Sequence, residues 1–432
     1  MTLVLEAPPL LGRTTGERIV VDGGISLRGR MRAPGSKNAC LPIMAACLLA
    51  RGDCRLEGVP DISDVHVMSD IMRALGAKVE LDINGTMWIN TDDLKTTTAP
   101  YDLVRRMNAS FDVAGPLLAR YGHAEVALPG GCNLGQRPVN LHLDGFRMLG
   151  ADVSVEHGNV LARASRLKGT RMVLAKVSVG ATENLMMAAT LADGVTILEN
   201  AAREPEVSDL AHFLNRMGAH ISGIGTSTLT IEGVTELQGT RHHVIPDRIA
   251  TGTYMLATAI TGGDVVFEGV DSWHLGVFLH ELHAAGQSVE MGPGFIRVQG
   301  QRPVEPLDVA TGPFPGFATD LHPPLVSLLA LGTGTSIVEE TIFDGRFQYV
   351  NELNRMGADI RVTDRVARIR GVRRLAGAPV EAPDIRAGGA LILAALVAEG
   401  RTSIGGVEFI DRGYEHVEET LSSLGARIRR TI

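Results

Sequence analysis

Apolar and polar positions along this chain repeat with a period of roughly 70 residues. Each period opens with a helical segment that is apolar along its whole length, followed by a β-branched stretch such as residues 195–201. An amphipathic helix, exemplified by residues 65–75, and a further strand come next. A helix that is apolar on every side is buried on every side. The pattern therefore predicts six helix–strand–helix–strand units, with the apolar helices at the centre and sheets around them.

Two sets of glycines mark the units, because a helix commonly ends at a glycine in the left-handed conformation. The first set ends the apolar helices at Gly52, Gly122, Gly194, Gly262, Gly334 (or Gly332) and Gly400. The second set closes the amphipathic helices at Gly76, Gly150, Gly218, Gly286, Gly357 and Gly425. The same helix–strand–helix–strand unit is thus expected six times along the chain.

A chain of 432 residues is too long for one core, so two domains of three units each are expected. The pattern is interrupted near Pro246, and the strand pair at 18–32 is expected to complete the last unit. These boundaries predict a first domain over 37–244 and a second over 1–36 and 245–432. Two chain crossings, near Gly35 and near Pro246, would form a hinge, and the cleft between the domains is the expected active site.

Composition narrows the class of protein. A net charge of −8 argues against a nucleic-acid binder. No apolar run reaches membrane-spanning length and no signal-peptide pattern is present, so a cytoplasmic protein without membrane partners is expected. The cysteines form no CxxC pair, which argues against a zinc or redox motif, and no metal is expected. Cys40, Cys47 and Cys54 fall in one apolar helix and its exit and are expected to be buried thiols.

The segment at residues 33–38 opens the first apolar helix. Ser36 is a good N-cap, the free amides of the helix N-terminus face an incoming anion, and Lys37 adds a full positive charge. An anion site is one interpretation of this segment. A surface lysine that merely follows a cap is the other.

A glycine-rich loop over residues 128–138 has no counterpart in the other units. It carries Cys132 and, five residues on, Arg137. A nearby cation or amide dipole would lower the pKa of this exposed thiol and favour the thiolate. The alternative is a flexible connector with an incidental cysteine.

Acidic and basic residues recur just before the apolar helices of the second half. Steps of the type Asp-Arg or Asp-x-Arg lie at 247–248, 384–386 and 411–412. A structural Asp–Arg pair and a ligand site both explain them. Asp320 is either the N-cap of the following helix or a general base.

Seven segments in order resemble the UDP-N-acetylglucosamine 1-carboxyvinyltransferases, enolpyruvyl transferases related to EPSP synthase. They read GSKNACLP, PGGCNLGQRPVNLHL, KVSVGATENL, ENAAREPEVSDL, PDRIATGTY, PGFATDLH and FIDRGYEHVE. The resemblance spans nearly the whole chain from about residue 18, although EPSP synthase lacks the PGGC loop. It implies an α/β fold: a two-domain inside-out α/β barrel, EPSP synthase-like.

The resemblance also implies an activity. The enolpyruvyl group of phosphoenolpyruvate would pass to the 3-hydroxyl of UDP-N-acetylglucosamine with release of phosphate, the first committed step of peptidoglycan biosynthesis and hence of cell wall biogenesis, cell shape and division. The two substrates would be the partners, with no cofactor and a monomeric enzyme. The cysteine loop would make it a fosfomycin target.

Roles for individual residues follow from the same resemblance. Lys37, Arg137, Arg386 and Arg412 would neutralise the phosphate and carboxylate of phosphoenolpyruvate, because the tetrahedral intermediate concentrates negative charge. Cys132 would be the acid that protonates the methylene or forms a covalent adduct, and Asp320 the base. The nucleotide sugar would be held by Asn38, Asn108, Arg137, Pro138, Val139, Asn140, Leu141, His142, Lys176, Val177, Ser178, Val179, Gly180 and Ile342.

Three departures from the family pattern lie on the acceptor side. Asn108 stands where the family usually has Arg, Asn140 stands where an Asp is common, and His322 with the two prolines after it is atypical. They leave open a paralogue that acts on another uridine nucleotide in secondary metabolism. A catalytically dead binding protein is a third alternative, which the intact set of Lys37, Cys132, Asp320 and Arg412 disfavours.

Overall fold

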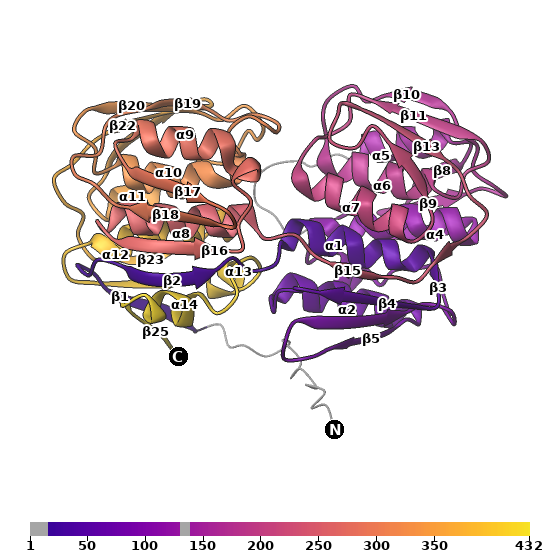
Figure 1. Ribbon diagram of the computed structural model, residues 1–432, viewed down its shortest axis with the longest axis horizontal. Helices are drawn as coiled ribbons and strands as arrows, with labels where there is room; N and C mark the ends of the chain where they lie inside the picture. The colour runs from indigo at the N-terminus through magenta and orange to yellow at the C-terminus, as the bar shows by residue number, and fades with distance from the viewer. Residues whose placement is uncertain (1–15, 130–138) are drawn as a thin grey trace. The chain divides into compact units, whose positions relative to one another are not determined.

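The structure, a computed structural model, describes residues 16–129 and 139–432. These residues divide into two compact units, each with its own hydrophobic core. Unit 1 comprises residues 35–129 and 139–245, and unit 2 comprises residues 16–34 and 246–432. Figure 1 shows helices and sheets interleaved within each unit.

Three apolar helices lie at the centre of each unit, as the hydrophobic pattern predicts. In unit 1 they are α1 (Lys37–Ala46), α4 (Ala114–Tyr121) and α6 (Val179–Ala189). In unit 2 they are α8 (Arg248–Ile260), α10 (His322–Leu329) and α12 (Ile385–Val397). Nearly every side chain of α1, α8 and α12 is buried, so these helices contribute to the cores on all their faces.

The outer helices bury one face only. They are α2 (Ser63–Leu75), α5 (Asn140–Met148), α7 (Pro205–Arg216), α9 (Gly276–Ala284), α11 (Val350–Arg355) and α14 (Val417–Ser423). Short helices complete the set: α3 (Tyr101–Val104), α13 (Val407–Ile410), η1 (Cys47–Leu49), η2 (Asn108–Val113), η3 (Ser272–Leu275) and η4 (Thr319–Leu321). No helix of the described ranges is long and apolar enough to cross a membrane.

The sheets of unit 1 share one strand order. The first runs β15 (Arg241–His243), β4 (Asp53–Glu57), β6 (Thr86–Asn90), β5 (Lys78–Leu81). The second runs β7 (His123–Ala127), β9 (Asn159–Arg163), β8 (Asp152–Glu156), and the third runs β10 (Arg171–Val173), β11 (Val195–Glu199), β13 (Thr228–Glu232), β12 (His220–Ser222). A two-stranded parallel pair joins β3 (Ala50–Arg51) to β14 (Leu237–Gln238).

Unit 2 repeats this order in its three sheets. The first runs β2 (Arg28–Arg32), β16 (Asp264–Glu268), β18 (Phe295–Gln299), β17 (Ser288–Gly292). The second runs β19 (Asp308–Ala310), β20 (Thr335–Glu339), β22 (Val366–Arg370), β21 (Asp359–Thr363). The third runs β23 (Pro379–Glu381), β24 (Arg401–Gly405), β1 (Arg18–Asp22), β25 (Arg427–Thr431). Five of these six sheets thus begin with a parallel leading strand, the β7 sheet being three-stranded, and each of the six has one antiparallel strand more than the helix–strand–helix–strand pattern predicts.

The N-terminal strand pair does not stay together, which corrects the expectation that both strands complete the last repeat. β1 lies between β24 and β25 and completes the sixth repeat, as expected. β2 instead pairs in parallel with β16 of the fourth repeat. Because β15 likewise pairs with β4 of the first repeat, each unit is closed by a strand from a distant part of the chain.

Eleven of the twelve glycines predicted to end a helix have positive φ, as the prediction requires. They are Gly52, Gly122, Gly194, Gly262, Gly400 and the six glycines of the second set. The exception is the fifth apolar helix: neither Gly332 nor Gly334 has positive φ. There the Gly332 N–H donates to the Leu329 carbonyl and closes a turn without a left-handed residue.

The three cysteines of the first repeat are buried, as predicted, although in three different elements. Cys40 lies in α1, Cys47 in η1 and Cys54 in β4. Cys54 is thus a strand residue whose side chain enters the core of unit 1. Burial raises the pKa of the Cys40 thiol.

Candidate active site

Lys37 begins α1 and is buried beside a carboxylate. Its helix starts at Ser36, whose Oγ accepts a hydrogen bond from the Ala39 N–H at 3.3 Å. Lys37 Nζ lies 2.7 Å from Oδ2 of Asp64 in α2, and the two side chains are 10% and 2% exposed. The interpretation of Lys37 as a surface lysine is therefore wrong. An anionic ligand reaching this helix N-terminus would share Lys37 with Asp64.

His142 belongs to a hydrogen-bonded group that joins four elements of unit 1, namely α5, α6, η2 and α4. The Asn184 amide of α6 donates to His142 Nδ1 (3.2 Å) and to the Phe111 carbonyl of η2 (3.0 Å), and its oxygen accepts from the Gly115 N–H (2.7 Å). The His142 ring meets the edge of the Phe111 ring at 5.2 Å. Desolvation by burial lowers the pKa of His142 to about 4, so the imidazole is neutral at neutral pH.

The N-terminus of α6 lies against this histidine. Ser178 caps the helix by accepting from the Ala181 N–H at 3.3 Å. A Cβ placed on Gly180 would lie 3.6 Å from His142 Cε1, an ordinary van der Waals distance, so the first turn of α6 lies next to the imidazole ring. Two parts of the predicted nucleotide-sugar site, from α5 and from α6, are thus side by side.

The other predicted nucleotide-sugar residues of unit 1 differ in how accessible they are. Asn38 in α1 and Asn108 at the start of η2 are half-buried, whereas Lys176 and Asn140 are exposed. Val139 and Leu141 are buried and Leu141 belongs to the hydrophobic core, so its side chain packs rather than faces solvent. Cys132, Arg137 and Pro138 lie outside the described residues.

Two buried acids of unit 1 were missed by the sequence analysis. Asp112 in η2 and Glu183 in α6 are nearly inaccessible to solvent, and Asp112 Oδ1 lies 4.0 Å from a Cβ placed on Gly180. Burial raises the pKa of Asp112 to about 8. Burial and the charges of Asp112, Glu206 and Glu204 raise the pKa of Glu183. The only signal in the sequence was an acid within an otherwise apolar stretch.

Asp112 is expected to make stability depend on pH. Its folded pKa of about 8 exceeds its ordinary value of 3.8, so between these values the folded state holds a proton that the unfolded state has lost. Stability therefore falls as pH rises through this window, and Asp112→Asn should reduce the fall between pH 5.5 and 8.5 by on the order of 2 kcal/mol. Denaturant unfolding at both pH values measures it. Asp144→Asn, which alters an exposed acid, is the control; equal pH dependence in both variants would refute the assignment.

Unit 2 gathers a second group of candidate residues around Asp320. Its Oδ1 accepts from Arg346 Nη2 at 2.7 Å and its Oδ2 from Arg386 Nε at 3.0 Å. The following helix α10 has Leu321, not Asp320, at its N-cap position. The N-cap interpretation of Asp320 is therefore wrong, and its carboxylate is held between two guanidinium groups.

Both arginines keep a donor that the described residues do not use. Arg346 and Arg386 are almost fully buried, and Arg346 Nε and Arg386 Nη1 have no hydrogen-bond partner among the residues that the structure describes. Buried N–H donors are normally satisfied, and a guanidinium binds carboxylate and phosphate strongly. These two donors are suited to an anionic ligand.

Arg386 is fixed by its surroundings at the start of α12. Asp384 caps the helix by accepting from the backbone N–H groups of Arg386 and Ala387, at 2.8 and 3.0 Å. The guanidinium lies over the Tyr414 ring at 5.5 Å, and a Cβ on Gly413 would lie 3.6 Å from Arg386 Nη1. The turn that carries Arg412 therefore lies beside Arg386. In this step the Asp is a helix cap and the Arg is not its side-chain partner.

In the other two Asp-Arg steps, too, the aspartate has a partner outside the step. Asp247 caps α8, while the Arg248 guanidinium lies 5.7 Å from the Phe314 ring. Asp411 forms an ion pair with Arg430 at 2.7 Å. In each of these two steps the aspartate thus has a partner outside the step, the N-terminus of α8 for Asp247 and a distant arginine for Asp411.

Arg346 was missed by the sequence analysis, which reached only Ile342 in that segment. Ile342 is partly exposed, and its N–H donates to Glu340 Oε1 at 2.7 Å. Glu340 is fully buried and lies 3.2 Å from His322 Nε2. Desolvation by burial and the charge of Arg346 lower the pKa of His322, so this atypical histidine is a neutral core residue. No local pattern marks Arg346, because its partner lies 26 residues away.

The two groups lie in different units, with Lys37, His142 and Gly180 in unit 1 and Asp320, Arg386 and Arg412 in unit 2. Neither group offers a metal site: the described part of the chain contains no cluster of three or more His, Cys, Asp or Glu side chains able to hold an ion. What it offers is cationic donors, a carboxylate and helix N-termini, which suit anionic organic substrates.

Comparison with known proteins agrees with that chemistry. Residues 21–421 match the profile of the family EPSP synthase (3-phosphoshikimate 1-carboxyvinyltransferase). A UDP-N-acetylglucosamine 1-carboxyvinyltransferase of Symbiobacterium thermophilum is 52% identical over 96% of this chain and 98% of its own length. A second, of Caldanaerobacter subterraneus, is 49% identical over 96% and 99%.

Solved structures agree with the fold. The enolpyruvyl transferase NikO from Streptomyces tendae superposes with a TM-score of 0.88 at 26% identity, covering 96% of this chain and 99% of that one. EPSP synthase from Acinetobacter baumannii gives 0.75 at 21% identity over 96% and 100%. The predicted fold class is confirmed. The chain belongs to the EPSP synthase family of enolpyruvyl transferases. Within that family it belongs to the UDP-N-acetylglucosamine 1-carboxyvinyltransferases.

Proposed function

We propose that this protein transfers the enolpyruvyl group of phosphoenolpyruvate to the 3-hydroxyl of UDP-N-acetylglucosamine and releases phosphate, the first committed step of peptidoglycan biosynthesis. The observation that carries the proposal is the half-identical, nearly full-length similarity to proteins of that name. The Asp320 group supports it, because it combines a carboxylate with two buried guanidinium groups that each keep a free donor.

The reaction begins with addition of the acceptor hydroxyl oxygen to C2 of phosphoenolpyruvate. Asp320 takes the hydroxyl proton, and Cys132 gives a proton to the methylene carbon, which yields a tetrahedral ketal. Loss of phosphate and of one proton from the new methyl group restores the double bond in the product. Cys132 is assigned this role from its sequence motif.

The arginines around Asp320 have two proposed roles: they bind the anionic substrate, and they control the basicity of Asp320. The ketal carries a carboxylate and a phosphate, and Arg386, Arg346, Arg412, Lys37 and Arg137 are the cations proposed to stabilise it. A carboxylate that accepts from two guanidinium groups is a weak base. An anionic substrate competes with Asp320 for Arg346 and Arg386, and their release from Asp320 restores its basicity at the moment of binding.

The acceptor is proposed to bind at the His142 group of unit 1. The neutral imidazole can accept or donate without adding charge, and the capped N-terminus of α6 presents amides to a diphosphate. Because the proposed cations come from both units, we propose that the substrates are enclosed between them. The enzyme would act as a monomer in the cytoplasm, without a cofactor.

Phosphate release measures this function directly. With phosphoenolpyruvate present, UDP-N-acetylglucosamine should give the highest kcat/KM, ahead of UMP and shikimate 3-phosphate. Cys132→Ala should reduce turnover by about 10²–10⁴-fold, as expected for loss of a general acid. Wild-type turnover in this variant would refute the acid role, whereas absence of phosphate release with the sugar nucleotide would refute the function.

A second candidate is an enolpyruvyl transferase that uses another uridine nucleotide. The departures at Asn108 and Asn140 favour it. Phosphate release with UMP and none with UDP-N-acetylglucosamine would establish it. Under the first function, Asn108→Arg should lower KM for the sugar nucleotide, because one charge-assisted contact contributes about 1.5–3 kcal/mol.

A further inference from the structure

Unit 1 contains a cavity of about 500 Å³ at the C-terminal ends of its central helices. Its lining comes from the ends of η1 and α4, from Arg51 of β3, from Leu191 after α6, and from the segments that follow β9 and β13. The candidate substrate residues Lys37 and Ser178 lie at the opposite, N-terminal ends of α1 and α6. A helix of ten residues is about 15 Å long, so the cavity is a separate place within the unit.

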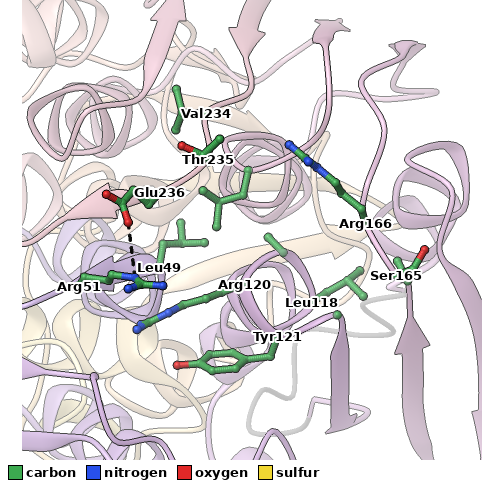
Figure 2. A pocket seen from close by; sticks show the side chains of 14 residues that line it. Leu49, Arg51, Leu118, Arg120, Tyr121, Ser165, Arg166, Val234, Thr235 and Glu236 are labelled. Atoms are coloured by element: carbon green, nitrogen blue, oxygen red, sulfur yellow. Dashed lines mark ion pairs between the residues drawn. The ribbon is translucent and has the colours of Figure 1, made fainter.

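Arginines dominate the charge of this cavity. The lining holds Arg51, Arg120 and Arg166 against a single acid, Glu236, a net charge of +2. Figure 2 shows Arg51 and Arg120 close together, with Arg166 reaching in from the opposite side. The volume falls within the range of small-molecule sites.

Arg120 is pre-positioned and has donors to spare. Its Nη1 donates to the Leu48 carbonyl (2.8 Å) and to Thr91 Oγ1 (2.9 Å), and the guanidinium lies over the Tyr121 ring at 5.1 Å. Nε and Nη2 make no hydrogen bond to any described residue. A guanidinium fixed by one nitrogen can present the other two to a ligand without further ordering of the side chain.

Arg51 and Arg166 are held only loosely. Arg51 Nε lies 3.6 Å from Glu236, and Arg166 Nη2 lies 3.8 Å from Asp193, with the two arginine side chains 69% and 56% exposed. Such contacts contribute little. Cations near helix C-termini often bind the last carbonyls. Arg120 does so, but neither Arg51 nor Arg166 donates from its side chain to a backbone carbonyl of the described residues, so capping does not account for them.

We propose that this cavity binds a phosphorylated small molecule, with its phosphate groups on Arg51, Arg120 and Arg166. Phosphate oxygens match the bidentate donors of guanidinium groups, and the hydroxyl of Thr235 in the lining supplies a further donor. Glu236 competes with the ligand for Arg51. The site is independent of the transferase chemistry proposed above.

Calorimetric titration of the full chain with pyrophosphate tests the site. The double variant R51A/R166A should bind at least tenfold more weakly than the control R147A/R171A. The control removes two exposed, ion-paired arginines of the same unit, so the change in net charge is matched. Pyrophosphate that binds at the candidate active site contributes equally to the titrations of both double variants, so the difference in affinity between them reports on the cavity. E236Q should bind several-fold more tightly, and basal phosphate release should stay within twofold in all variants.

Equal pyrophosphate affinity in R51A/R166A and R147A/R171A would overturn the proposal, as would unchanged or weaker binding by E236Q. Matching unfolding midpoints of the two double variants would show that a loss of affinity reflects the cavity and not the fold.

Discussion

Replacing Asp320 by Ala is expected to reduce turnover by about 10²–10⁴-fold, the range for a general base. The same change leaves Arg346 and Arg386, both almost fully buried, without the carboxylate between them. Stability should therefore fall by about 1–3 kcal/mol, moderated because the Asp320 side chain is 26% exposed. Steady-state phosphate release and denaturant unfolding measure the two effects.

A matched control separates the role of Asp320 from a general effect of removing an acid. Asp344 forms an ion pair with Arg365 in the same unit, but its side chain is 79% exposed. Asp344→Ala should leave turnover and stability close to wild type. If Asp320→Ala retains turnover within tenfold of wild type, Asp320 is not the base.

Replacing Lys37 by Met is expected to have the second large effect. Asp64, 2% exposed, loses the ammonium group 2.7 Å away, and removing one partner of a buried ion pair costs about 3–5 kcal/mol. Turnover should fall as well, since Lys37 is proposed to stabilise the anionic ketal. The equilibrium unfolding midpoint and kcat/KM for phosphoenolpyruvate report the two losses.

A second change at Asp64 distinguishes structure from catalysis. In Lys37→Met/Asp64→Asn both charges of the buried pair are removed together, so most of the lost stability should return while turnover stays low. Arg171→Met, which breaks an ion pair between the exposed Arg171 and Glu199, serves as the control and should change little. Recovery of turnover together with stability would show that Lys37 acts only in folding.

The repeats and the central helices could be predicted from the sequence because they depend on local chemistry. A segment that is apolar on every side is buried wherever the fold places it, as α8 and α12 show. A helix that ends in a left-handed turn favours glycine, and Gly76 and Gly425 adopt that conformation. The motif resemblance also predicted the family, and it proposed Lys37, Asp320 and Arg386 as site residues because each belongs to a short specific segment.

Partners of the candidate residues were decided by tertiary structure alone. Asp64 reaches Lys37 from another helix, and Arg346 reaches Asp320 across 26 residues of sequence. The separation of β1 from β2, which join the sixth and fourth repeats, has the same origin. Periodicity reports which face of an element is buried and not which element covers it. Packing brings distant side chains together. The neighbour of a buried ionisable side chain then determines the charge and basicity of that side chain and whether it is available to a ligand.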